Sequence, residues 1–190
     1  MTERSPKTSL THPLPLAEVQ IPGGVGRILF TMCPGKIQPH ADTGPWDRDL
    51  ERDMDAVAAH KVVRLVTLME VHEIKACALS IEKLQNACAS RNIIWHHIPI
   101  KDFNVPDQAW EQIWETVGAD LRGDLKAGKA IALHCRGGRG RAGLVAARLL
   151  IEFGAAPEAA ITDVRTQRPE AIETRIQEDH LRDIKQVTEA

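Results

Sequence analysis

The sequence predicts an α/β fold with a central, mostly parallel sheet flanked by helices. Apolar segments of strand length alternate with segments whose apolar residues recur at helical spacing. Residues 62–68 form a continuous apolar, β-branched run typical of a strand buried on both faces. A chain of 190 residues suits one domain, and its sequence contains no internal repeat. We expect a flexible N-terminal segment over residues 1–16, rich in Ser, Thr, Pro and charge, and a single domain over residues 17–190.

Two short strands are predicted first, at 19–21 and 27–32, around the glycine-rich segment 22–26. This segment resembles part of a dinucleotide fingerprint, but it lies between strands and does not open a helix, so we interpret it as a hairpin turn. Helical spacing then covers residues 47–60, ahead of the buried strand at 62–68. Two further helices are predicted, at 71–78 and 81–90.

The second half of the chain continues the alternation. A strand at 93–100 precedes a helix that starts at Pro106 and Asp107 and ends near Gly128. The short apolar strand 130–133 leads directly into a cysteine-containing loop, and the following segment 142–153 is strongly helical. Two last helices are predicted at 157–167 and 173–187. In a parallel sheet of this kind, ligands bind at the carboxyl ends of the strands, where the cysteine loop lies.

Composition excludes several classes of function. The formal net charge of −2 gives no reason to expect a nucleic acid or an anionic membrane as partner. Apolar stretches fall short of a membrane span, and the N-terminal segment has no apolar core like that of a signal peptide, so we expect a cytoplasmic protein. The four cysteines lack the paired spacing of a disulfide framework or a zinc site, so neither a metal nor another cofactor is expected.

The loop from Cys135 to Arg141 has the composition of an anion-binding catalytic site. Gly137, Gly138 and Gly140 let the backbone curl so that successive N–H groups face inward, and the next helix adds its positive N-terminal end. This environment favours the thiolate form of Cys135, the nucleophile. Arg141 can hold two phosphoryl oxygens at once. His134, just before the cysteine, can orient the loop through hydrogen bonds.

The string HCRGGRGRAG resembles the signature of protein tyrosine and dual-specificity phosphatases. The surrounding chain, over roughly residues 27–185, is more narrowly similar to the kinase-associated phosphatase group, which acts on a phosphothreonine of cyclin-dependent kinases. The resemblance implies a dual-specificity-phosphatase-like fold and hydrolysis of phosphomonoesters through a phosphocysteine intermediate. It also implies that Arg136, Gly137, Gly138, Arg139 and Gly140 bind the substrate's phosphate.

Two segments outside the loop support this resemblance. Residues 98–107 are similar to the family's general-acid loop, which implies that Asp102 protonates the leaving oxygen and then activates water. Asp107 is a competing candidate, although its position after Pro106 is explained by a helix start. Residues 171–177 are similar to the segment that supplies a water-positioning glutamine, here Gln177.

The loop departs from the family pattern at three positions. Ala142 replaces the usual Ser or Thr, whose hydroxyl helps the cysteine sulfur to leave, so we expect slow hydrolysis of the phosphoenzyme. Arg136 and Arg139 together resemble the loop of the tensin-related lipid 3-phosphatase, and such extra charge favours a polyanionic substrate. The alternative for both side chains is that they point into solvent or pair with acidic neighbours.

Three functions therefore remain open. The leading hypothesis is a phosphatase acting on phosphotyrosine, phosphothreonine or phosphoserine in proteins. The second keeps the chemistry but acts on inositol phosphates or phosphoinositides, and the third is an inactive phosphopeptide-binding module. The joint presence of Cys135, Asp102 and Arg141 argues against the third.

Overall fold

The computed structural model describes residues 5–41 and 43–187. Its central sheet has five strands in the order β2-β3-β8-β6-β7. The pairs β3–β8, β8–β6 and β6–β7 are parallel, and β2 is antiparallel to β3. The strands of this sheet are β2 (Ala17–Gln20), β3 (Arg27–Met32), β8 (Ala130–Cys135), β6 (Val62–Thr67) and β7 (Ile94–His97). The predicted fold class is confirmed.

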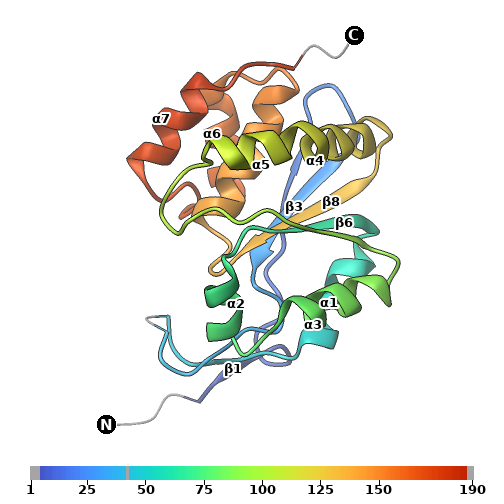
Figure 1. Cartoon of the computed structure of the whole chain (residues 1–190), viewed down its shortest axis with the longest axis vertical. Helices are drawn as coiled ribbons and strands as arrows, with labels where there is room; N and C mark the ends of the chain where they lie inside the picture. The colour runs from blue at the N-terminus through green and yellow to red at the C-terminus, as the bar shows by residue number, and fades with distance from the viewer. Residues whose placement is uncertain (1–4, 42, 188–190) are drawn as a thin grey trace.

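Helices cover both faces of the sheet. Figure 1 shows α4 to α7 on one side of the sheet and α1 to α3 on the other. Their bounds are α1 (Leu50–Ala59), α2 (Val71–Ala76), α3 (Ile81–Ala89), α4 (Gln108–Lys126), α5 (Gly140–Glu152), α6 (Pro157–Gln167) and α7 (Arg175–Asp183). Within residues 5–41 and 43–187, no helix is both long and apolar enough to cross a membrane.

Alternation along the central strands places apolar side chains in two cores. In β8, Ile131 and Leu133 belong to one buried cluster, which also contains residues of α4, α5 and α6. Ala130 and Ala132 belong to the other cluster, with residues of α1 and α3. Because successive side chains face opposite cores, a strand that is buried on both faces is apolar at every position. Cys135 continues the row of Ile131 and Leu133.

Helix α4 carries two tryptophans that face the core. Trp110 and Trp114 are buried on α4, and their rings stack with centroids 4.8 Å apart. The indole N–H of Trp114 donates to Glu152 Oε1 on α5, 2.8 Å away. The carboxylate of Asp107 caps the same helix by accepting the backbone N–H of Trp110 at 2.8 Å. Asp107 is therefore a helix cap, which explains its position after Pro106.

A second, small sheet lies outside the predicted elements. It joins β1 (Lys7–Thr8), β5 (Trp46–Asp47) and β4 (Ile37–Gln38) in the order β1-β5-β4. The flexible segment expected over residues 1–16 is therefore corrected from Lys7 onward, while residues 1–4 lie outside the described part. The physical reason is anchoring: β1 pairs with β5, and Leu14 is buried in the core beside Trp46.

Candidate active site

The loop that follows β8 connects a buried strand directly to the N-terminus of a helix. Cys135 is the last residue of β8 and pairs in register with Met32 of the neighbouring strand β3. Arg141 is the second residue of α5. The carboxyl ends of β3, β8 and β6 meet here, so segments distant in the sequence converge on the loop.

Gly138 gives the loop its shape. Its φ of 68° lies in the left-handed region, and a Cβ at this position would stand 2.2 Å from the backbone nitrogen of Met32. Only glycine combines that conformation with so close an approach. As a result the Gly138 N–H points back at Cys135 and lies 3.2 Å from its Sγ. A donor in this position stabilises a thiolate.

Side chains from outside the loop hold its backbone. Arg168, which follows α6, donates from Nη2 to the carbonyl oxygen of Gly137 at 3.0 Å. Lys36, just before β4, directs Nζ at the carbonyl oxygen of Arg136 at 3.5 Å. The N–H of Gly140 donates to Glu173 Oε2 at 2.9 Å. The loop is thus fixed from both sides by residues that the sequence signature does not contain.

Arg141 is fully buried and is held by Glu73 on α2. The two side chains form a double ion pair, with Nη1 2.5 Å from Oε2 and Nη2 2.7 Å from Oε1. Burial disfavours the charged guanidinium, but the Glu73 contact outweighs it and raises the pKa of Arg141. Burial likewise opposes ionisation of Glu73, yet hydrogen bonding from Arg141 lowers the pKa of this carboxyl. Both groups therefore stay charged.

Both terminal nitrogens of the Arg141 guanidinium contact protein groups, which leaves Nε without a partner in the described part of the chain. The carbonyl oxygen of Ile100 accepts a hydrogen bond from Nη1 at 3.0 Å, so Glu73 and this carbonyl group together hold Nη1. Nε is buried and has no hydrogen-bond partner among the described residues. Nη2 also contacts Asp102 Oδ1 at 2.9 Å. The Nε–Nη2 edge has the geometry to bind two oxygens of one phosphoryl group.

Asp102 and Gln177 both reach this site. Asp102 lies in the loop between β7 and α4 and lines the same cavity as Cys135. Gln177 on α7 is completely buried, in contrast to a solvated glutamine on a polar helix face. Its Nε2 donates to the carbonyl oxygen of Asn104 at 3.1 Å, while Oε1 is buried without a partner among the described residues. Gln177 therefore bridges the Asp102 loop to the cysteine loop, where it packs against Gly140.

His134 is buried beneath the loop and kept neutral. Its Nε2 lies 2.7 Å from Thr67 Oγ1, and Trp95 donates its indole N–H to the same hydroxyl oxygen at 2.9 Å. The Thr67 hydroxyl proton is then free to be donated to Nε2, which places the ring proton on Nδ1. Burial lowers the pKa of His134 to about 3. His134 therefore orients the end of β8 without taking part in proton transfer.

Replacing His134 should change how stability depends on pH. The unfolded chain binds a proton at His134 near pH 6.5, whereas the folded protein does so only near pH 3. Protons therefore favour unfolding in this window, and stability is lost as the pH falls from 6.5 toward 3. We expect the free energy of unfolding to depend less steeply on pH in His134→Gln, by up to about 1.4 kcal/mol per pH unit. Urea unfolding at several pH values measures it, and a slope equal to that of the wild type contradicts the prediction. The exposed His72→Gln is the control.

The cavity over Cys135 has a volume of about 320 Å³ and is lined mainly by cations and polar groups. Lys36, Arg136, Arg139 and Arg141 contribute positive charge, and Asp102 and Glu173 contribute carboxylates. Gln38, Thr43 and Phe103 complete much of the wall. Of the loop residues predicted to bind phosphate, Arg136, Gly137 and Arg139 line this cavity, whereas Gly138 and Gly140 are not among its lining residues.

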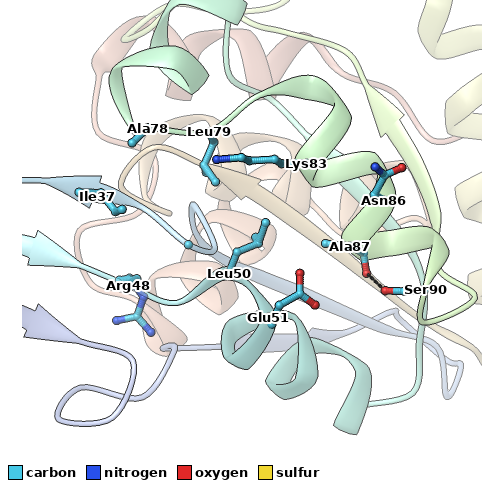
Figure 2. Close-up of a pocket in the computed structure, with 11 residues that line it drawn as sticks. Ile37, Arg48, Leu50, Glu51, Ala78, Leu79, Lys83, Asn86, Ala87 and Ser90 are labelled. Carbon is cyan, nitrogen blue, oxygen red and sulfur yellow. Dashed lines mark hydrogen bonds between the residues drawn. The ribbon is translucent and has the colours of Figure 1, made fainter.

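A larger groove of about 570 Å³ lies on the other side of β4. Figure 2 shows it between α1 and α3, with Ile37, Leu50 and Leu79 on its walls and Lys83 reaching across it. Successive residues of the same segment face the two cavities: Ile37 lines the groove, whereas Lys36 and Gln38 line the cysteine cavity. Among the described residues, those that line the groove include no cysteine, whereas Cys135 lines the other cavity.

Sequence reasoning missed three residues of the site. Glu73 could have been sought, because a buried arginine needs a carboxylate and the helix after the strand at 62–68 ends near the loop. Lys36 follows the strand at 27–32, at the same edge of the sheet. Nothing in the sequence singles out Arg168, because a lone arginine after a helix is usually solvated.

Comparisons with known proteins agree with this geometry. The family model of the Swiss Army Knife protein DSP-PTPase phosphatase domain matches residues 46–181. A search of curated protein sequences finds no match.

Solved structures extend the likeness to most of the chain. A structure of kinase-associated phosphatase (KAP), with its catalytic cysteine replaced by serine, is 25% identical, covers 89% of this chain and 92% of its own, and has a TM-score of 0.75. Tk-PTP in its active form is 27% identical over 89% of this chain and 96% of its own, with a TM-score of 0.65. PTPMT1 in complex with PI(5)P is 18% identical over 88% and 93% of the two chains, with a TM-score of 0.62, which shows a shared fold alone.

The family model spans well over half of the chain and includes the strand, loop and helix that carry Cys135 and Arg141. The chain therefore belongs to the DSP-PTPase phosphatase domain family and is a cysteine-dependent phosphatase.

Proposed function

We propose that this phosphatase hydrolyses phosphomonoesters through a phosphocysteine formed on Cys135. The observation that carries the proposal is that Cys135 and Arg141 line one cavity, with the Gly138 N–H 3.2 Å from Cys135 Sγ and Arg141 Nε buried without a hydrogen-bond partner among the described residues. Phosphorylated tyrosine, threonine or serine in proteins is the first substrate class, since two neighbours of at least 25% identity are named as a kinase-associated phosphatase and a PTP. A nucleophilic thiolate requires a reducing compartment, so we infer a cytoplasmic location.

In the first step, the Cys135 thiolate attacks phosphorus and the ester oxygen leaves. Arg141 binds two of the equatorial oxygens through Nε and Nη2, and the loop N–H groups bind the remaining charge. Asp102 donates a proton to the leaving oxygen. Because Nη2 of Arg141 already contacts Asp102, the acid is held next to the position that the phosphoryl group takes.

In the second step, water attacks phosphorus and the phosphorus–sulfur bond breaks. Asp102, now ionised, accepts a proton from the water. The free Oε1 of Gln177 is available to orient this water. The Gly138 N–H stabilises the departing thiolate of Cys135.

The second step is expected to limit turnover because Ala142 offers no hydroxyl to the sulfur. Ala142 is completely buried at the start of α5, and the Gly138 N–H is left as a donor to Cys135 Sγ. We expect a burst of leaving group in rapid-quench kinetics. Adding a hydroxyl by Ala142→Ser should reduce the burst and raise kcat about tenfold to a hundredfold, in line with one hydrogen bond to a charged group. A strictly linear time course for the wild type contradicts the prediction.

A substrate panel with Asp102→Asn tests the proposal. We expect wild type to release phosphate from p-nitrophenyl phosphate and from phosphotyrosine or phosphothreonine peptides. Asp102→Asn should lower kcat by about 10²- to 10⁴-fold on the peptides, whose leaving groups need a proton. The matched control is Asp107→Asn, which changes only a helix cap and should retain activity. A wild type inactive on every compound of the panel defeats the proposal.

Soluble inositol phosphates are the second substrate class. The observation that favours them is that Lys36, Arg136 and Arg139 line the cavity without an ion pair to any described residue. Neither Arg136 nor Arg139 pairs with an acidic neighbour in the described part of the chain, which supports this second class.

A further inference from the structure

Lys36 is an unusual lysine, because its side chain is buried beside the catalytic loop without a carboxylate partner. The residue is only 4% exposed. Its Nζ lies 5.0 Å from the centre of the Trp46 ring and 3.5 Å from the carbonyl oxygen of Arg136. Burial lowers the pKa of Lys36; the neighbouring Cys77 and Cys33 act against this, and Arg136 and Arg139 act with it. A buried ammonium in such surroundings is stabilised when an anion binds to it.

Buried arginines elsewhere in the fold differ from Lys36 because they have carboxylate partners. Arg48, Arg148 and Arg141 are buried, and each is paired with at least one carboxylate. In contrast, no ion pair is formed by Lys36, Arg136 or Arg139 within the described residues. All three line the cavity over Cys135. Besides Arg141, the cavity therefore has three cations on its wall that no carboxylate of the described residues pairs with, and these cations can bind an anion.

We propose that Lys36 and Arg136 form a subsite for a second phosphoryl group of the substrate, next to the group that Cys135 attacks. The inference rests on the proposed function and chooses between its two substrate classes. Because Lys36 is almost completely buried, the second phosphoryl group must enter the cavity together with the first, on one small scaffold. A neighbouring phosphorylated side chain of a peptide lies along the surface instead. The polar wall residues Gln38 and Thr43 suit the hydroxyls of a polyol such as inositol.

The test compares substrates with one and two phosphoryl groups in matched variants. The ratio of kcat/KM for myo-inositol 3,4-bisphosphate to that for myo-inositol 3-phosphate is measured by phosphate release. We expect this ratio to fall at least about tenfold in Lys36→Met, which keeps a side chain of similar length but removes the charge. Lys36→Arg should keep the ratio within a few-fold. The control Lys83→Met removes an exposed lysine of the neighbouring groove and should leave it unchanged.

Binding to the Cys135→Ser protein separates the two proposals. Calorimetry with the same two compounds should show the same loss of preference when Lys36→Met is added. If the ratio of the two dissociation constants is the same with and without Lys36→Met, the subsite is overturned and the proposed function stands. If wild type hydrolyses no phosphomonoester, the proposed function itself fails.

Two further assays decide whether the second phosphoryl group belongs to a lipid headgroup or to a protein. Vesicles containing phosphatidylinositol 3,4-bisphosphate test a lipid headgroup, and a preference for them that depends on Lys36 supports the subsite. A peptide with adjacent phosphothreonine and phosphotyrosine tests a protein substrate. If this peptide shows the dependence on Lys36 and the inositol compounds do not, the small-scaffold inference is overturned.

Discussion

Cys135→Ser should lower the rate of phosphate release by roughly four to six orders of magnitude, as loss of a catalytic nucleophile does in other hydrolases. A serine hydroxyl at this position is a far poorer nucleophile than a thiolate, because it ionises only at much higher pH. The shape of the loop should persist, since Gly138 donates its N–H to oxygen as readily as to sulfur. Initial rates with p-nitrophenyl phosphate measure the loss, and thermal unfolding confirms that the variant is folded.

Cys88→Ser is the matched control for this experiment. Cys88 is completely buried on α3 in the second core cluster, and burial raises the pKa of its thiol to about 12. It is therefore an unreactive thiol away from the cavity, and its replacement should leave kcat/KM within about threefold of wild type after correction for folded protein. Retained activity in Cys135→Ser would falsify the assignment of the nucleophile.

Glu73→Gln should reduce both stability and catalysis. The change leaves the buried guanidinium of Arg141 without its counter-charge, and breaking a buried pair in this way costs about 3–5 kcal/mol. Arg141 should then shift away from the Nε–Nη2 orientation that serves the phosphoryl group. We expect kcat to fall by about 10²- to 10³-fold, as when one transition-state donor is removed. Denaturant unfolding and steady-state kinetics measure the two effects.

An exposed ion pair provides the comparison for Glu73. Glu51 contacts Arg91 at 2.9 Å, but its side chain is 67% exposed. Glu51→Gln should cost less than about 1 kcal/mol, because solvent screens such pairs. Equal effects of the two substitutions on stability, or a Glu73→Gln protein with normal kcat, contradict the role given to the buried pair.

The α/β fold class and the catalytic loop were accessible from sequence for a simple physical reason. The buried run at 62–68 and the apolar run before Cys135 are continuous because both faces of the sheet are covered by helices. Gly138 is required by a local backbone conformation, which a sequence motif records directly. Asp102 and Gln177 were named through a resemblance; Asp102 lines the cavity and Gln177 packs behind it against Gly140, and their chemical roles stay predictions.

The supporting residues could not be predicted, because their function depends on distant partners. Glu73 has no motif of its own, and only the burial of Arg141 gives it a purpose. Lys36 cannot be distinguished from other lysines in the sequence, because its position beside Trp46 depends on the small sheet of β1, β5 and β4. That sheet was missed because its strands have two residues each, too short for a period of two to be visible. The segment 7–16 was judged by composition, although one buried leucine, Leu14, anchors it.

The pairing of β3 with β8 has a consequence for how the enzyme is made. These central neighbours are about a hundred residues apart in the chain, and the cavity they support is completed by Lys36 from one end and Glu173 from the other. Contacts of such long range form late, because a large loop must close first. A nascent chain that stops before Glu173 therefore has its nucleophile but lacks one carboxylate of the cavity wall, so the cavity is finished about forty residues after Cys135 has been made.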